Sequence, residues 1–332
     1  MSEHRAVTIV GDGGWGTAIA MVLCSKGTPV TMWGHDPTYL DEMRETRENR
    51  LFLPGTRLPE GIRFEADLGA AMQHGELIIT AIPTKFLRLS LAGARGLVPK
   101  GVGVVSLTKG VEQNTLQRPS QILEECLGTR RIAVLSGPSH AEEVVKNKPT
   151  TVVVSSQDEP LARQAQQILC TPRFRLYTSN DVVGVELGGA LKNVIALAAG
   201  ICTGLELGDN ALAALLTRGL AEMTRLGVAL GARERTFSGL SGMGDLVTTC
   251  TSPHGRNRAV GLQIGQGKRL QEILDTMDQV AEGVTTTVSA RALGRETSIE
   301  LPIVEQVYEV LYEDKDPLPG VGSLMTRDPK PE

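Results

Sequence analysis

A lysine lies inside one of the most apolar stretches of this chain. Lys192 and Asn193 follow two adjacent glycines and precede an apolar run (residues 194–199) within the segment VGVELGGALKNVIALAAGICTG. Burying an ammonium group without a partner is costly, and each glycine inside a helix costs about 1 kcal/mol relative to alanine. Two such costs side by side predict that another group approaches this helix closely beside an amine able to donate a proton. The alternative is that Lys192 extends its charged end to the surface.

A glycine-rich turn follows the first predicted strand. Gly11, Gly13 and Gly16 give the spacing G-x-G-x-x-G directly after the apolar run AVTIV (residues 6–10) and at the start of a helical pattern. In this context the first glycine allows a tight turn, the second lets the backbone approach a pyrophosphate, and the third lets helix and strand pack closely. The first N–H groups of the helix would bind the phosphates. The pattern predicts a dinucleotide site rather than a purely structural turn.

The choice between NAD and NADP depends on the end of the second predicted strand, MWGHDP. An acidic residue there normally binds the ribose 2′-hydroxyl of NAD, and Asp36 is suitably placed. His35, when protonated, would instead meet the 2′-phosphate of NADP. Both residues could equally form a solvated turn before Pro37. We expect NADP to be favoured, with NAD as the alternative.

Two further clusters follow predicted strands at the edge where doubly wound sheets bind ligands. Lys109 ends the segment VSLTKG, and LSGPSHAEEV places Gly137, Ser139 and Ala141 at the start of a predicted helix. A ligand-binding role is one interpretation of these residues. The alternatives are a surface lysine at 109, a serine at 139 that only caps the helix, and a turn histidine at His140.

A polar, glycine-punctuated segment, SGMGDLVTTCTSPHGRNR (residues 241–258), is predicted to be a loop. It collects Asp245, Thr249, Arg256 and Asn257. The planar guanidinium of Arg256 and the amide of Asn257 suit a phosphate or a carboxylate. The alternative is a solvated basic loop. A dinucleotide, a buried amine, a carboxylate and an arginine together are the components of a carbonyl reductase for an anionic substrate.

The elements that must position these residues change character along the chain. The first half alternates helical patterns with nearly continuous apolar runs, as in parallel strands covered on both faces. The predicted strands are residues 6–10, 29–33, 77–82, 103–108, 132–137 and 150–156. Beyond about residue 183 only helical patterns follow, with a polar, proline-rich tail. We expect an α/β protein with an N-terminal doubly wound (Rossmann-like), mostly parallel sheet in residues 1–183 and an all-helical domain in residues 184–332.

Composition excludes several classes of function. The net charge of −4 over 332 residues gives no reason to expect nucleic acid or an anionic membrane as a partner. No apolar run is expected to span a membrane, and the N-terminus lacks the apolar core of a signal peptide. The five cysteines are scattered, which indicates reduced thiols in a cytoplasm. The histidines are equally dispersed, and we expect no metal.

Eight motifs together resemble the bacterial NAD(P)-dependent glycerol-3-phosphate dehydrogenases. They are GDGGWGTAIA, WGHDP, SLTKG, SGPSHAEEV, GGALKNVIALAAGI, GLSGMGDLVTTCTS, GRNR and VAEGVTTT, in this order over some 280 residues. The resemblance implies reversible hydride transfer between NAD(P)H and dihydroxyacetone phosphate, giving sn-glycerol 3-phosphate for phospholipid synthesis. It also implies a homodimer.

The resemblance assigns roles residue by residue. Lys192 matches the proton donor and acceptor, and the Arg256–Asn257 pair matches the residues that grip the phosphate. The substrate-binding residues implied are Lys109, Gly137, Ser139, Lys192, Asn193, Asp245, Thr249, Gly255, Arg256 and Asn257. The cofactor-binding residues implied are Gly11, Gly13, Gly14, Trp15, Gly16, His35, Lys109, Ala141, Arg256, Val280 and Glu282.

One departure and two rival functions stay open at the level of sequence. The family usually has SRN where this chain has GRN, so Gly255 removes one hydroxyl donor from the phosphate grip. A related reductase acting on a β-hydroxyacid or a ketopantoate-like acid would place a carboxylate at Arg256. A non-catalytic NAD(P)H sensor would have no need for Lys192, Asp245 and Arg256 around one pocket.

Overall fold

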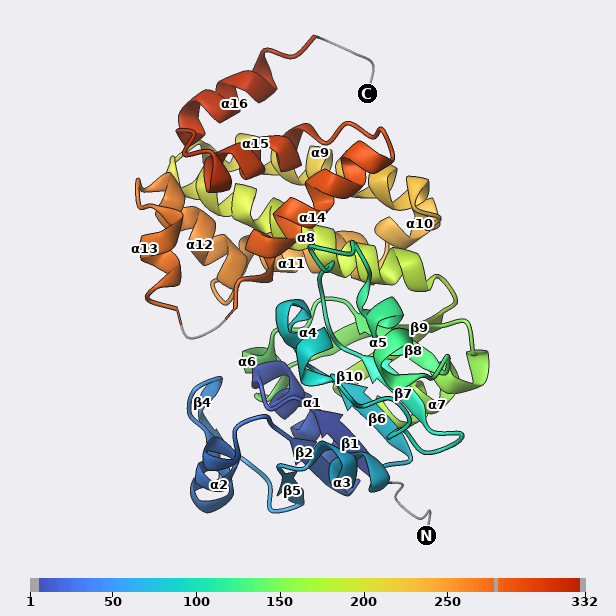
Figure 1. Ribbon diagram of the computed structural model, residues 1–332. Coiled ribbons are helices and arrows are strands. Elements are labelled where there is room, and N and C mark those ends of the chain that lie inside the picture. The colour runs from blue at the N-terminus through green and yellow to red at the C-terminus, as the bar shows by residue number, and fades with distance from the viewer. Residues whose placement is uncertain (1–5, 278–279, 329–332) are drawn as a thin grey trace. The chain divides into compact units, whose positions relative to one another are not determined.

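The computed structural model describes residues 6–277 and 280–328. By its internal contacts the chain divides into two compact units (Figure 1). The first comprises residues 1–109 and 117–186, and the second comprises residues 110–116 and 187–332. The short segment 110–116 leaves the first unit and returns to it, a feature that the sequence did not suggest. The division at 183/184 stays a prediction about independently folding domains.

The first unit is built on an eight-stranded sheet in the order β10-β9-β8-β7-β6-β1-β2-β5. Every neighbouring pair is parallel except β8 and β9, which are antiparallel. The strands are β1 (Val7–Val10), β2 (Val30–Trp33), β5 (Ile62–Glu65), β6 (Leu77–Thr80), β7 (Gly103–Ser106), β8 (Ile132–Ser136), β9 (Thr150–Ser156) and β10 (Phe174–Ser179). A separate antiparallel pair, β3 (Glu48–Asn49) and β4 (Leu53–Arg57), follows helix α2. The mostly parallel, doubly wound sheet is confirmed.

Helices cover both faces of this sheet (Figure 1). Alternate residues of one strand enter different cores: Ile9 packs in one cluster and Val10 in the other, and likewise Ile79 and Ile78. This explains the nearly continuous apolar strands, because neither face meets water. The helices of the first unit are α1 (Gly14–Cys24), α2 (Pro37–Thr46), α3 (Leu68–Gln73), α4 (Thr84–Ser90), α5 (Pro119–Leu127), α6 (Ala141–Val144) and α7 (Glu159–Leu169).

The regular elements of the second unit are helices in the part of the chain that the structure describes. Its elements are α8 (Val182–Gly204), which begins in the first unit, α9 (Gly208–Ala229), α10 (Glu234–Phe237), the π-helical segment η1 (Leu240–Gly244), α11 (Asp245–Thr251), α12 (Arg256–Gly265), α13 (Leu270–Leu274), α14 (Glu282–Glu296), α15 (Pro302–Tyr312) and α16 (Pro317–Met325). The helical C-terminal region is confirmed.

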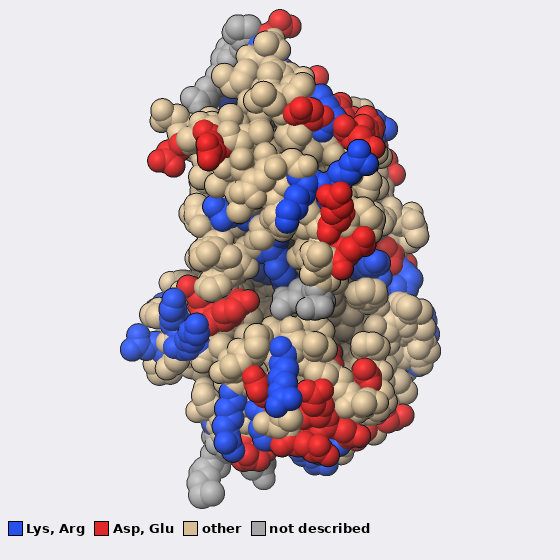
Figure 2. All heavy atoms as spheres, turned by 90° about the vertical axis from the view of Figure 1, so that its left-hand side faces the viewer, with Lys and Arg blue, Asp and Glu red and all other residues tan. Residues whose placement is uncertain are grey.

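Basic and acidic side chains lie interspersed on the face shown in Figure 2.

Several local expectations were wrong. The segment 241–258 is not one loop, because its backbone forms η1, α11 and the start of α12 around a short link at 252–255. The proline-rich tail forms α16, which Asp316 caps by accepting a hydrogen bond from the Leu318 N–H; its last residues, 329–332, lie outside the described residues. Helical patterns were expected beyond about residue 183, but residues 275–277 and 280–281, between α13 and α14, are not helical. Residues 278–279 lie outside the described residues.

Within the described residues, helix α8 is the segment that meets the length and composition of a membrane span. With 23 residues and a mean hydropathy of 1.5 in its most apolar window, it is long and apolar enough to cross a bilayer. However, 83% of that window is buried inside the protein, as in the core helix of a globular domain. Length and composition alone are weak grounds for a span when the helix is already covered by its own chain.

Candidate functional site

The glycine-rich turn between β1 and α1 has the shape that a pyrophosphate needs. Gly11 has a φ of +122°, a conformation that L side chains rarely adopt. A Cβ on Gly16 would overlap the carbonyl oxygen of Gly11, so helix and turn pack backbone to backbone. A Cβ on Gly13 would instead meet nothing within 4 Å. Since α1 has no side-chain cap, its first N–H groups are left for a phosphate, and the residues present fit a dinucleotide.

The end of β2 places three polar side chains near one another. Asp36 is the N-cap of α2, and its Oδ1 accepts hydrogen bonds from the N–H groups of Thr38 (2.9 Å) and Tyr39 (3.3 Å). His35 is exposed beside it. The third side chain is Asp12 from the glycine turn, and its Oδ2 lies so close to Gly34 that a Cβ there would overlap it.

The carboxyl group of Asp12 is a feature that the sequence reasoning missed. Burial raises its pKa above the ordinary value, and the nearby charge of Asp36 acts in the same direction, while His35 opposes it. The position follows Gly11 directly, and an acidic residue inside the motif is the signal that could have found it. A negative charge here faces the region where doubly wound folds bind the ribose of the cofactor.

The ends of β7 and β8 bring together the residues expected there. Lys109 Nζ donates to the carbonyl oxygen of Gly137 (3.1 Å), and Ser139 Oγ donates to the same oxygen (2.8 Å). Gly137 has a φ of +139°, which favours glycine at this position. Ser139 is therefore not the helix cap: His140 occupies the N-cap position of α6, and Ala141 is its first residue.

In the second unit Lys192 is buried, with only 5% of its surface exposed. Its Nζ donates to Asp245 Oδ1 at 2.5 Å and to Thr249 Oγ1 at 2.6 Å. Asp245 and Thr249 lie one turn apart on α11, so both side chains point the same way. The alternative of a lysine that extends to the surface was wrong. The ammonium is held by a carboxylate and a hydroxyl inside the helical unit.

The glycines before Lys192 admit the protein's own backbone. A Cβ on Gly188 would lie 2.5 Å from the carbonyl oxygen of Ser241 in η1. This close contact places the beginning of α11, and with it Asp245, against α8. The prediction of a close approach is thus satisfied by η1. Farther along α8, Cβ atoms on Gly200 or Gly204 would overlap backbone oxygens of α12.

The backbone carbonyl of Asn193 and the side-chain amide of Asn257 meet the start of α14. Asn257 Oδ1 accepts a hydrogen bond from the Gly283 N–H at 2.9 Å, and a Cβ on Gly283 would lie 2.5 Å from the Asn193 carbonyl oxygen. Glycine at 283 therefore lets α8, α12 and α14 converge. The Asn257 oxygen accepts this one bond, and the two Nδ2 hydrogens are the donors that the amide can offer an anion. Val280 and Glu282, the expected cofactor-side residues, both precede Gly283 in the sequence.

The residues expected to bind the phosphate have different environments. Arg256 is exposed at the first position of α12, whereas Asn257 is buried. A Cβ on Gly255 would lie 2.7 Å from the carbonyl oxygen of Thr249. A serine at this position of this chain would require α11 or α12 to move, so glycine suits the contact between these two helices.

The predicted residues thus form two groups, one within each unit. The first group contains the glycine turn, Trp15, His35, Lys109, Gly137, Ser139 and Ala141. The second contains Lys192, Asn193, Asp245, Thr249, Gly255, Arg256, Asn257, Val280 and Glu282. Within residues 6–277 and 280–328, no group of three or more His, Cys, Asp or Glu side chains is arranged to hold a metal.

Comparison with known proteins gives the same family along the whole chain. Residues 6–162 match the family model of the NAD-dependent glycerol-3-phosphate dehydrogenase N-terminus, and residues 181–321 match that of the C-terminus. The chain is 50% identical over 329 residues to glycerol-3-phosphate dehydrogenase [NAD(P)+] of Geobacter metallireducens, covering 98% of both chains. It is 49% identical to the enzyme of the same name from Geobacillus kaustophilus, covering 98% of this chain and 96% of that one.

A solved structure agrees. The crystal structure of glycerol-3-phosphate dehydrogenase from Coxiella burnetii superposes with a TM-score of 0.93 at 37% identity, covering 97% of this chain and 99% of that chain. The glycine turn, the buried lysine and the arginine–asparagine pair therefore lie in a chain of matching sequence and fold. The chain belongs to the NAD-dependent glycerol-3-phosphate dehydrogenase family.

Proposed function

We propose that this chain catalyses the reversible reduction of dihydroxyacetone phosphate to sn-glycerol 3-phosphate with NADPH or NADH. The observation that carries the proposal is the buried ammonium of Lys192, held by Asp245 and Thr249 on a neighbouring helix. A buried amine with fixed hydrogen bonds can stabilise and protonate an oxygen that becomes negative. Membership of the family supplies the substrate class.

In the proposed reaction Lys192 transfers the proton, and Asp245 and Thr249 position it. The bound nicotinamide cofactor supplies the hydride that adds to C2 of the ketone. As the C2–O double bond becomes a single bond, negative charge develops on the oxygen, and Lys192 Nζ donates a proton to it. In the reverse direction the neutral amine accepts that proton. Asp245 and Thr249 hold Nζ in place, so the proton donor is positioned before the reaction begins.

We assign the phosphate of the substrate to Arg256 and Asn257. The hydrogen bond from the Gly283 N–H occupies Asn257 Oδ1 and leaves the Nδ2 hydrogens as donors. Arg256 adds a planar guanidinium at the first turn of α12, where the helix dipole also favours an anion. Gly255 has no side-chain hydroxyl, and its backbone N–H already donates to the carbonyl oxygen of Ser252 (3.3 Å). Binding energy from the phosphate then positions C2 for reaction.

For the cofactor, NADP remains the favoured partner in our proposal. Asp36 is already engaged as the cap of α2, which leaves exposed His35 as the side chain available to a 2′-phosphate. Asp12 opposes this preference, because its carboxylate lies at the same edge. The balance of the two is measurable as the ratio of kcat/KM for NADPH and NADH.

A homodimer, a cytoplasmic location and a role in glycerophospholipid synthesis complete the proposal. Each of the five cysteines is a free thiol, as expected in a reducing compartment. Light scattering coupled to size-exclusion chromatography would show twice the chain mass for the dimer. A single-chain mass at micromolar concentration would contradict that part of the proposal.

The reaction itself is tested with a substrate panel. We expect NADPH and NADH to be oxidised with dihydroxyacetone phosphate, and the product to be sn-glycerol 3-phosphate by chiral analysis. Ketopantoate and a β-keto acid serve as competitors with a carboxylate in place of the phosphate. Faster turnover of either acid would assign the chain to a different reductase function, and cofactor binding without any turnover would favour a sensor.

A further inference from the structure

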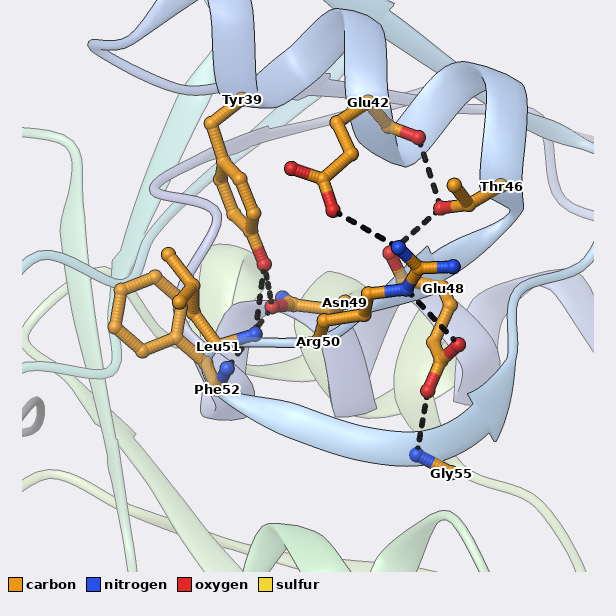
Figure 3. Close-up of polar contacts among 9 residues, drawn as sticks. All are labelled: Tyr39, Glu42, Thr46, Glu48, Asn49, Arg50, Leu51, Phe52 and Gly55. Carbon is orange, nitrogen blue, oxygen red and sulfur yellow. Dashed lines mark hydrogen bonds and ion pairs between the residues drawn. The ribbon is translucent and has the colours of Figure 1, made fainter.

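The β3–β4 hairpin carries a buried amide that none of the roles above uses. Asn49 ends β3, in the segment ENRLFLPG, and is fully buried with 0% of its surface exposed. The register of the hairpin shifts between Glu48 and Asn49. Such an irregularity re-aims a side chain, and Figure 3 shows Asn49 and Tyr39 directed toward each other above the hairpin.

All four hydrogen-bonding positions of this amide are used. Asn49 Nδ2 donates to the carbonyl oxygen of Asp12 (2.7 Å) and to Thr17 Oγ1 (2.7 Å). Asn49 Oδ1 accepts from the hydroxyl of Tyr39 (2.6 Å) and from the N–H of Phe52 (3.1 Å). An amide has two donors and one oxygen with two lone pairs, so the side chain is completely satisfied.

The Nδ2 and Oδ1 atoms of Asn49 face different parts of the molecule. Asp12 and Thr17 belong to the glycine turn and the first turn of α1, which are the elements that fit a pyrophosphate. Tyr39 and Phe52 belong to α2 and to the hairpin itself. The hairpin backbone also packs on the turn, because a Cβ on Gly14 would lie 2.7 Å from the carbonyl oxygen of Phe52. Asn49 therefore joins the hairpin to the phosphate-binding turn.

We propose that Asn49 is a positioning residue for the dinucleotide, which holds the glycine turn in its binding shape through the Asp12 carbonyl. The proposal rests on the proposed function and deepens it. A turn with four glycines within six residues, 11–16, has a large freedom to lose when it becomes ordered. A fixed external anchor removes part of that cost before the cofactor arrives, and pre-organisation of this kind raises affinity.

Asn49→Asp tests the two hydrogen bonds that Asn49 Nδ2 donates to Asp12 and Thr17. The carboxylate keeps an acceptor for the hydroxyl of Tyr39 and the N–H of Phe52, but it loses both donors and sets an oxygen against the Asp12 carbonyl. Loss of a buried hydrogen bond that leaves its partner unsatisfied predicts a dissociation constant for NADPH and NADH raised about tenfold to 100-fold. The measurement is direct titration of the full-length protein with each cofactor, without ketone.

Tyr39→Phe is the matched control, because it removes a contact on the opposite side of the same amide and leaves both donors in place. We expect its cofactor dissociation constants to stay within about threefold of the parent, whatever its melting temperature. KM for dihydroxyacetone phosphate at saturating cofactor should be unchanged in both variants. If Asn49→Asp does not fold, Thr17→Val removes one of the two acceptors isosterically and should weaken cofactor binding several-fold in the same direction.

Two results would overturn the proposal: normal cofactor affinity in the folded Asn49→Asp or Thr17→Val protein, or an equal loss in Tyr39→Phe, which would mean that general hairpin stability is responsible. Failure of the proposed function gives a different pattern. The parent would then bind NADPH without reducing the ketone, and the comparison of cofactor affinities among the variants would remain valid.

Discussion

One buried ammonium and its two hydrogen-bond partners are central to the proposed reaction. We expect Lys192→Ala to lower kcat for ketone reduction by at least about 10²-fold, the low end of what a general acid contributes. Cofactor affinity should change little, because Lys192 is not among the residues expected to bind the cofactor. Stopped-flow and steady-state NADPH oxidation measure the effect.

Lys315→Ala is a control for the removal of a lysine, since Lys315 pairs with Glu309 (2.5 Å) and is not among the predicted site residues. It should retain the parent's kcat. Retained turnover in folded Lys192→Ala would remove this residue from the proton-donor role.

Asp12 governs a second prediction at this scale. We expect Asp12→Ser to raise kcat/KM for NADPH relative to NADH by about tenfold, because it removes a negative charge from the edge where a 2′-phosphate would bind. Asp41→Ser, an exposed change on α2 that breaks the ion pair with Arg44, should leave the ratio unchanged. A ratio unaffected by Asp12→Ser would show that this carboxylate does not face the 2′ position.

At the scale of the element, the glycines of α8 determine how closely α12 can approach. A Cβ on Gly200 would overlap the carbonyl oxygen of Arg258. Gly200→Ala should therefore lower the free energy of unfolding by about 1–3 kcal/mol, although alanine favours helix. A Cβ on Gly322 in α16 would meet nothing within 4 Å. Gly322→Ala should therefore raise the free energy of unfolding by up to about 1 kcal/mol. Chemical denaturation measures both changes. Equal changes in the free energy of unfolding for Gly200→Ala and Gly322→Ala would contradict the close packing of α8 and α12.

Helix α15 gives a pH-dependent prediction. Glu222 on α9 accepts hydrogen bonds from the N–H groups of Ile303 (2.8 Å) and Val304 (3.3 Å). Burial raises the pKa of Glu222 from 4.5 to about 7. The folded state thus binds more protons than the unfolded state between these values, so this contribution to stability is complete below pH 4.5 and is lost as the pH rises through 7.

Over that range the loss corresponds to about 3 kcal/mol. Glutamine does not titrate, so we expect the melting temperature of Glu222→Gln to fall less than that of the parent protein between pH 5 and pH 8. Glu234→Gln, exposed on α10, is the control and should follow the parent. An unchanged pH profile in Glu222→Gln would assign the slope to other groups.

In the molecule as a whole, the central strands of the sheet could be predicted from the sequence, whereas the two edge strands could not. The six central strands were recognisable because both faces are buried and the runs are continuously apolar. Strands β5 and β10 close the two edges of the sheet, and buried residues alternate with exposed or partly exposed ones at 62–65 and 174–177. The same alternation occurs in irregular segments, so periodicity alone did not reveal them.

The site could be predicted in part for a related reason. Lys192 was conspicuous because a charge in an apolar helix has a local cost that the sequence displays. Asn49 was invisible, since its contact with the Asp12 carbonyl joins positions 37 residues apart and polar residues are ordinary in a turn. The segment between Ser241 and Arg258 was predicted to be a loop from its glycines, but tertiary packing of Gly188 and Gly242 makes it helical.

The most direct test of the central claim compares dihydroxyacetone phosphate with unphosphorylated dihydroxyacetone in one assay of NADPH and NADH oxidation. If Lys192 protonates the ketone and Arg256 and Asn257 hold its phosphate, kcat/KM should be at least about 10³-fold higher for the phosphorylated ketone. Arg256→Ala should remove most of that difference. Equal turnover of the two ketones, or turnover of neither by a protein that binds NADPH, would contradict the account.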